Sequence, residues 1–379
     1  MEAAVGAQLC TDTNATADLE RGRADYGRRA WAAAHQALSR ADQVAPVGIE
    51  DLEKLAICAY LIGRDDEYIS LLQRAYHAYL AAGATTSAAR SAFWLGLRLM
   101  FRGDKGQSSG WLGRAERLLS DEPVESTERG YLLLAAAQLQ LDAGNFVGAA
   151  NAAETALRIG ERSAEVDLSA TARHLLGHIE IRLGNVGAGL AHFDETMVAA
   201  VGGELSPIVT GLIFCSVVEA CQDVCAFERA QEWTLALAEW CEQQPEMIAF
   251  AGICSVHRAE VLQLNGAWSE AWLETERAMS RCVSVNRRAT GAAHYQQAEL
   301  YRLRGELALA EDAYRCASEL GYEPQPGLAL LRLAQGRTDA ASAAIRRLTS
   351  ATSDRLRRAR LLPAHLEIML TMGDVEEAR

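Results

Sequence analysis

Hydrophobic and polar positions along this chain follow the period of amphipathic helices, and one small residue interrupts the pattern at regular intervals. The interruption is a glycine at eight places and a cysteine at a ninth. Successive interruptions are 40, 41, 40, 41, 41, 39, 31 and 37 residues apart. They lie at Gly63, Gly103, Gly144, Gly184, Cys225, Gly266, Gly305, Gly336 and Gly373. Because glycine tolerates the left-handed conformation that often ends a helix, the pattern predicts a series of helix pairs.

The residues that flank each turn also recur. A small residue lies seven positions before the turn, as at Ala56 and Gly96. Alanine is favoured five positions after the turn, as at Ala149, and again twelve positions after it, as at Ala75. Small side chains at fixed points let the two backbones of a pair approach closely, and large side chains fill the space between pairs. A further, less regular pair is predicted over residues 15–45.

These features predict an all-α solenoid of about nine to ten antiparallel helix pairs. It resembles the tetratricopeptide class and is expected to form a right-handed superhelix. Its period of about 40 is longer than the usual repeat of about 34 residues. We expect a repeat domain over 15–379 after an N-terminal segment over 1–14. The last predicted pair is truncated at Arg379, within its second helix, so the natural gene is expected to continue.

Composition and charge exclude some classes of function for this segment. The 50 acidic residues exceed the 37 Lys and Arg residues, and the resulting net charge of −13 disfavours binding of nucleic acid by this segment itself. The start of the chain lacks the basic and apolar regions of a signal peptide. The longest apolar stretch, near 207–218, is too short to span a membrane. We therefore predict a cytoplasmic protein with no membrane partner and no cofactor.

Several stretches resemble the helical repeat region of bacterial LuxR-type transcriptional regulators. They include DLEKLAICAYLIGRDDEYISLLQRAYHAYLAAG, HRAEVLQLNGAWSEAW and RLLPAHLEIMLTMGDVEEAR, in the family's order from about Leu19 onward. In that family a C-terminal helix-turn-helix domain binds promoter DNA. Nothing in this sequence resembles the LTxRExEVL opening of that domain or a phosphate-binding loop. The resemblance implies a sensory or regulatory region that binds an effector or protein partner and controls a downstream DNA-binding domain.

Candidate binding residues follow from the tetratricopeptide pattern, in which the first helix of each pair lines a concave groove. Positions 13, 10, 6 and 3 before each turn residue face this groove. The candidates are Arg90, Phe93, Tyr131, Gln138, His174, His178, Cys215, Glu219, Gln222, Glu260, Gln263, Tyr295, Glu299 and Arg302. The predicted lining is aromatic and apolar in the early pairs and becomes polar and acidic later. A concave surface with convergent polar groups is the default candidate for a binding site.

Other chemistry has weaker support. His174 and His178 have metal-ligand spacing, but Leu175 replaces the glutamate of a zinc protease and no third ligand is evident. The dispersed cysteines are typical of a reduced protein interior, although redox sensing by one of them stays open. We therefore predict a binding protein without catalysis or bound metal. The alternative to a LuxR-type sensor is a stand-alone scaffold for protein partners, and a homodimer is compatible with either.

Overall fold

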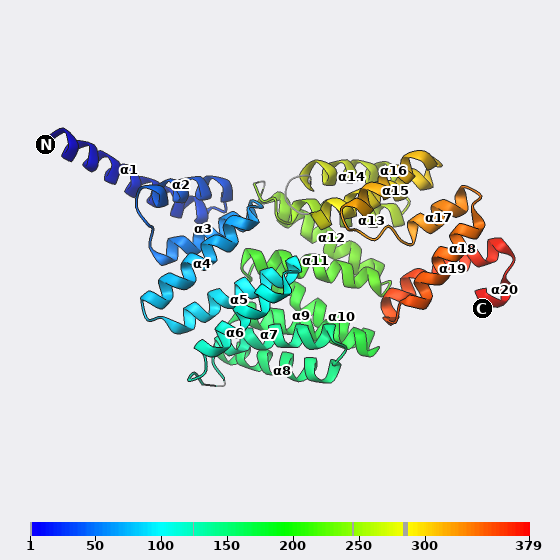
Figure 1. Ribbon diagram of the computed structural model, residues 1–379, viewed down its shortest axis with the longest axis horizontal. Coiled ribbons are helices and arrows are strands. Elements are labelled where there is room, and N and C mark those ends of the chain that lie inside the picture. Colours follow the sequence, from blue (N-terminus) through cyan, green and yellow to red (C-terminus); the bar gives the residue numbers. More distant parts are fainter. Residues whose placement is uncertain (1, 124, 245, 283–286) are drawn as a thin grey trace. The chain divides into compact units, whose positions relative to one another are not determined.

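The computed structural model describes residues 2–123, 125–244, 246–282 and 287–379, and within these ranges every regular element is a helix (Figure 1). The helices are α1 (Glu2–Gly27), α2 (Trp31–Val44), α3 (Ile49–Leu61), α4 (Asp65–Ala81), α5 (Thr85–Arg102), α6 (Lys105–Leu118), α7 (Thr127–Asp142), α8 (Phe146–Ser163), α9 (Val166–Leu183), α10 (Val186–Val201), α11 (Pro207–Asp223), α12 (Phe227–Glu242), α13 (Ala251–Leu264), α14 (Trp268–Cys282), α15 (Arg287–Leu303), α16 (Leu307–Glu319), α17 (Gly327–Ala334), α18 (Thr338–Ala351), α19 (Arg355–Met372) and α20 (Val375–Ala378).

Consecutive helices form pairs, from α1 with α2 to α19 with α20, and the predicted all-α repeat fold is confirmed. The helix α1 runs through the position between residues 14 and 15, where the repeat domain was predicted to begin. The domain limits themselves stay a prediction. None of the helices in the described ranges is both long and apolar enough to cross a membrane.

The turn inside each of nine pairs adopts the left-handed conformation that the glycine pattern predicts. The backbone φ angle is positive at all eight turn glycines, from 73° at Gly336 to 94° at Gly184. Cys225 occupies the equivalent position with a φ of 58°. A side chain at such an angle crowds its own backbone, which glycine avoids. Cys225 therefore carries a local strain that the other turns of this series lack.

Replacement of Cys225 by glycine is expected to stabilise the chain. Relief of the left-handed conformation gains about 1–2 kcal/mol, and the added freedom of glycine in the unfolded chain offsets about half of this gain. The measurement is chemical denaturation of both proteins. Cys225→Ala is the matched control, because it removes the thiol and keeps the Cβ atom. Equal stability of the glycine and alanine variants would show that backbone strain is not the cause.

Small residues bring the helices of a pair into close contact, as predicted from the flanking pattern. A Cβ atom on Gly177 in α9 would lie 2.5 Å from the ring of Phe193 and 3.0 Å from the backbone oxygen of Gly189 in α10. In α5, the carbonyl of Gly96 accepts a 2.8 Å hydrogen bond from the buried Ser108 hydroxyl of α6. These positions hold small residues because the partner helix fills the space that a side chain would need.

The chain divides into two compact units. Unit 1 comprises residues 1–213 and 242–249, and unit 2 comprises residues 214–241 and 250–379. Each unit has its own core of alanine and leucine with a few large aromatic side chains. In unit 1, for example, Phe193 is fully buried, and in unit 2 the ring of Tyr314 is enclosed by Ala298, Ala310 and Leu331. The candidate surfaces are therefore described for each unit by itself.

Candidate binding surfaces

In unit 1, polar side chains near the start of three successive first helices contact one another. Arg90 of α5 donates a 2.9 Å hydrogen bond to Glu128 of α7, and its second nitrogen lies 3.8 Å from Glu165, the residue before α9. The Tyr131 hydroxyl donates to the same Glu165 carboxylate at 2.9 Å. The guanidinium of Arg90 also lies over the Tyr131 ring, 5.3 Å from its centre. The predicted residues Arg90 and Tyr131 thus join one network that links three pairs.

The aromatic candidates of unit 1 lie largely in its core. Phe93 is 2% exposed and Tyr131 is 3% exposed, and both pack with Leu134 and Leu168. Their ring centres are 5.2 Å apart. Only the Tyr131 hydroxyl reaches the polar network, and burial together with the Glu165 charge raises its pKa. The neighbouring helices cover these rings, which the spacing from the turn did not reveal.

His174 and His178 contact each other in α9. Their Nε2 atoms are 3.1 Å apart, and both rings lie against Phe193. Burial lowers the pKa of His178 to about 4, and burial together with the neighbouring His178 ring lowers the pKa of His174 well below its usual value. Both rings are therefore neutral at pH 7, and the N–H group of one donates a hydrogen bond to the ring nitrogen of the other.

The candidate Gln138, on α7, donates a 2.9 Å hydrogen bond to Asp142 on its own helix.

In unit 2, the first helices α11 and α13 are joined through Gln222 and Glu260. The Gln222 amide donates to the Glu260 carboxylate at 3.1 Å, and His257 Nδ1 lies 3.3 Å from the same oxygen. Burial alone would raise the pKa of Glu260, but the adjacent imidazole outweighs it and lowers that pKa. The predicted candidate Glu219 is exposed one turn away on α11. An acidic surface therefore spans α11 and α13.

An arginine of α19 meets this acidic surface. Arg360 forms a 2.7 Å ion pair with Asp223 at the end of α11. Burial would lower the pKa of Arg360, but the charges of Asp223 and Glu260 raise it. The Arg360 side chain is exposed, at 52% of its full accessibility. Arg360 reaches the acidic surface through a contact between residues that are 137 positions apart in the chain.

The remaining candidates of unit 2 lie on α13 and α15 and form contacts of their own. Gln263 accepts a 2.8 Å hydrogen bond from Gln296, and the Tyr295 hydroxyl accepts one from the backbone of Gly327. Glu299 is buried and accepts hydrogen bonds from Arg302 at 2.6 Å and from the Tyr314 hydroxyl. These contacts tie the candidate side chains into the packing between pairs.

Among the described cysteines of unit 2, several are buried or partly buried and one lies exposed on a turn. Cys215, a predicted candidate on α11, is partly buried, and burial raises the pKa of its thiol. Cys221 and Cys254 are buried, whereas Cys225 is exposed. Within the ranges that the structure describes, no three His, Cys, Asp or Glu side chains are grouped so that they could hold a metal ion.

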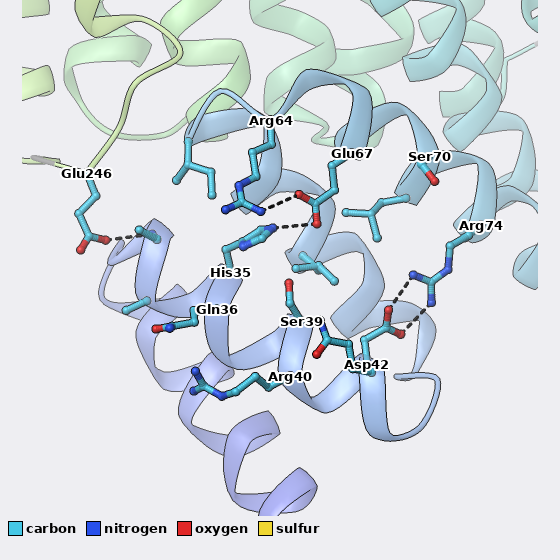
Figure 2. A pocket seen from close by; sticks show the side chains of 16 residues that line it. His35, Gln36, Ser39, Arg40, Asp42, Arg64, Glu67, Ser70, Arg74 and Glu246 are labelled. Carbon is cyan, nitrogen blue, oxygen red and sulfur yellow. Dashed lines mark hydrogen bonds and ion pairs between the residues drawn. The ribbon is translucent and has the colours of Figure 1, made fainter. Parts of the chain in front are cut away.

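A cavity of about 790 Å³ lies in unit 1, between second helices and beside the first helix α3, away from the predicted first-helix positions (Figure 2). It runs between α2 and α4, and we call it the α2–α4 trough. Apolar side chains of Leu55, Ile62 and Leu71 contribute to its lining, together with the buried ring of His35. His35 Nε2 lies 3.0 Å from Glu67, which fixes the ring against α4. The trough is thus a hollow lined by both polar and apolar side chains.

Charged pairs border the trough. Arg74 makes two 2.7 Å hydrogen bonds to Asp42, and Arg64 lies 3.3 Å from Glu67 (Figure 2). Arg40, also at the border, is bonded to Asp18 of α1. The carboxylates and guanidiniums of the border thus already pair with each other or with neighbouring parts of the chain.

The segment 242–249, with residue 245 outside the described residues, belongs to unit 1 and adjoins the trough. Gln244 accepts a 3.1 Å hydrogen bond from the buried Trp31 indole, and Glu246 accepts one of 2.9 Å from the backbone of Ala32. The backbone amides of Ile248 and Ala249 both donate to the carbonyl of Leu61. We call this stretch the inserted segment, because the chain before and after it belongs to unit 2.

The trough was not identified from the sequence. The groove positions of the tetratricopeptide pattern lie on first helices, whereas α2 and α4 are second helices. The polar run Gln36, Ser39, Arg40 and Gln43 on α2 was the available signal. No sequence pattern indicates that Glu246 borders the trough, because this residue is more than 200 positions away from α2 in the chain.

Comparisons with known proteins support the fold. No family model and no curated protein matches this sequence. Among solved structures, the crystal structure of a Rap protein complexed with Competence and Sporulation Factor is similar, with a TM-score of 0.60 and 14% identity. The match covers 87% of this chain and 95% of that chain. The apo form of RapI matches with a TM-score of 0.46 and 11% identity over 95% of this chain and 99% of that one. At this identity the first similarity shows the fold alone.

Proposed function

We propose that this chain recognises a peptide or protein segment on the surface of its first helices, and that the recognition is regulatory and not catalytic. The observation that carries the proposal is the contact between predicted candidates on successive first helices, above all Gln222 with Glu260. Side chains that meet in this way form one continuous polar surface across several pairs. Such a surface suits an extended segment that contacts several repeats at once.

The charge of this surface in unit 2 indicates the chemistry of its partner. Glu219, Asp223 and Glu260 lie on α11 and α13, and Arg360 of the same chain pairs with one of them. The Arg360 guanidinium thus already forms an ion pair within this group of carboxylates. A partner segment with arginine or lysine side chains would present a similar cationic group, so we propose a basic segment.

The similar Rap protein was solved with Competence and Sporulation Factor bound, and this supports recognition of a partner by a fold of this kind. The finer proposal, that the chain is the sensory region of a LuxR-type regulator, rests on the sequence resemblance. The sequence of the gene beyond codon 379 tests it. A helix-turn-helix segment there would support the regulator, and a stop codon would favour the stand-alone scaffold.

The binding proposal predicts a charge-dependent interaction. Labelled peptides of net positive, zero and net negative charge are titrated against the protein, and the change in anisotropy is measured. We expect positive peptides to bind and Glu219→Lys to weaken their affinity by about tenfold, because like charges then face each other. The matched control is Glu232→Lys on α12, an exposed glutamate on a second helix.

The control should leave the affinity for positive peptides nearly unchanged. If positive peptides do not bind, or if Glu219→Lys and Glu232→Lys weaken binding equally, the acidic first-helix surface is not the recognition site. An equal loss would instead indicate a general effect of net charge.

A further inference from the structure

The α2–α4 trough is lined by residues other than those of the first-helix surface. We propose that the trough binds a short, extended peptide segment that carries a carboxylate, next to the inserted segment. The trough is large enough for such a ligand: its volume of about 790 Å³ lies within the range of protein sites for small ligands. Its apolar lining at Leu55 and Leu71 can accept an apolar side chain of the segment.

The polar groups of the trough match a peptide backbone. Ser39 has a buried hydroxyl that lacks a hydrogen-bond partner among the described residues. Gln36 and Gln43 on α2 and Ser70 on α4 are exposed along the walls. A peptide backbone brings one donor and one acceptor for each residue, and such groups need partners once they leave water. Amide and hydroxyl side chains on both walls can supply these partners.

The exposed guanidinium of Arg64 at the border can hold a ligand that carries hydrogen-bond acceptors. The carboxylates of Asp42, Glu67 and Glu246 already accept bonds from Arg74, from Arg64 and from the backbone of Ala32. An arginine has five N–H donors and no acceptor. Arg64 is well exposed, and its contact with Glu67 leaves most of these donors available. A ligand carboxylate near Arg64 would therefore meet a planar donor group that suits it.

The chain itself shows that this region holds a non-helical segment. The inserted segment is bound to unit 1 by the side chains of Gln244 and Glu246 and by two backbone bonds to Leu61. One of these contacts is a carboxylate on the backbone at the start of α2, which is the favourable end of a helix for an anion. A ligand in the trough would lie against Glu246 and would therefore restrain the inserted segment.

The test uses the full chain and the same labelled peptides of positive, zero and negative charge. We expect negative peptides to bind, and we expect Ser70→Trp, which fills the trough from an exposed position, to weaken this binding by at least about tenfold. Arg64→Ala is a second variant that removes the proposed carboxylate partner and leaves the trough open. It should weaken the binding of negative peptides and leave that of neutral ones unaffected.

The matched control is Ser109→Trp, which places the same side chain on an exposed position of another second helix, α6. Hydrogen exchange supplies an independent measurement, because a peptide in the trough should slow exchange at Ile248 and Ala249. The proposal is overturned if no negative peptide binds or if Ser70→Trp and Ser109→Trp change the peptide affinity equally. It is also overturned if the peptide slows hydrogen exchange at other amides and not at Ile248 and Ala249. Since positive peptides and Glu219→Lys report on the first-helix surface, either proposal can fail without the other.

Discussion

Replacement of Glu299 by alanine is expected to lower the free energy of unfolding by about 3–5 kcal/mol, the usual cost of removing one partner of a buried ion pair. The Glu299 side chain is 11% exposed and that of Arg302 is 15% exposed. Glu299 accepts hydrogen bonds from the Arg302 guanidinium and from the Tyr314 hydroxyl. Alanine would leave the arginine charge buried without its counter-charge and the hydroxyl without its acceptor.

Chemical denaturation followed by circular dichroism measures this loss. The double variant Glu299→Leu/Arg302→Leu should recover much of it, because removal of both charges leaves neither uncompensated. Glu323→Ala, at an exposed glutamate nearby in sequence, is the control and should change the stability by less than about 0.5 kcal/mol. A loss below about 1 kcal/mol for Glu299→Ala would show that the pair is effectively solvated, as for surface ion pairs.

Acidification from pH 6.5 to pH 4 is expected to destabilise unit 1 through His174 and His178. An unfolded histidine has a pKa near 6.5, whereas burial lowers that of folded His178 to about 4. Within this window the unfolded state binds more protons, so the histidine contribution is fully present above pH 6.5 and is lost as the pH falls. The shift of His178 corresponds to about 3 kcal/mol, and His174 shifts in the same direction.

The measurement compares unfolding of the native protein and His174→Gln/His178→Gln across this pH range. Carboxylates titrate in both proteins, so the difference between the two curves isolates the histidine pair. Replacement of the exposed His77 by glutamine is the control and should leave the native pH profile unchanged. Parallel profiles for the native protein and the double glutamine variant would mean that the two rings are as well hydrated as in an unfolded chain.

These two expectations also bear on the candidate surfaces. Glu299, Arg302, His174 and His178 were predicted to line a binding groove, and the structure places each in a contact that also stabilises the fold. Loss of binding in variants at these positions would therefore mix recognition with stability. Glu219 on α11 and Ser70 on α4 are exposed, so they separate the two effects better.

Local sequence was enough to define the helix pairs and their turns. A left-handed turn is a local requirement of the backbone, so glycines spaced about 40 residues apart mark each turn through their spacing alone. The small residues at Gly96 and Gly177 likewise follow from local spacing, because each lies opposite its own partner helix. The replacement of glycine by Cys225 is visible in the same spacing, and its φ angle is positive as at the turn glycines.

Which candidates are buried, and where the cavity lies, depends on the tertiary structure. Phe93 and Tyr131 have groove spacing, but neighbouring helices cover their rings, and burial depends on all surrounding helices and not on one helix. The trough needs α2, α4 and Glu246, and the contacts of Trp31 and Ala32 with the inserted segment join residues more than 200 positions apart. Helical periodicity describes one face of one helix, so contacts at this separation appear only when the chain is folded.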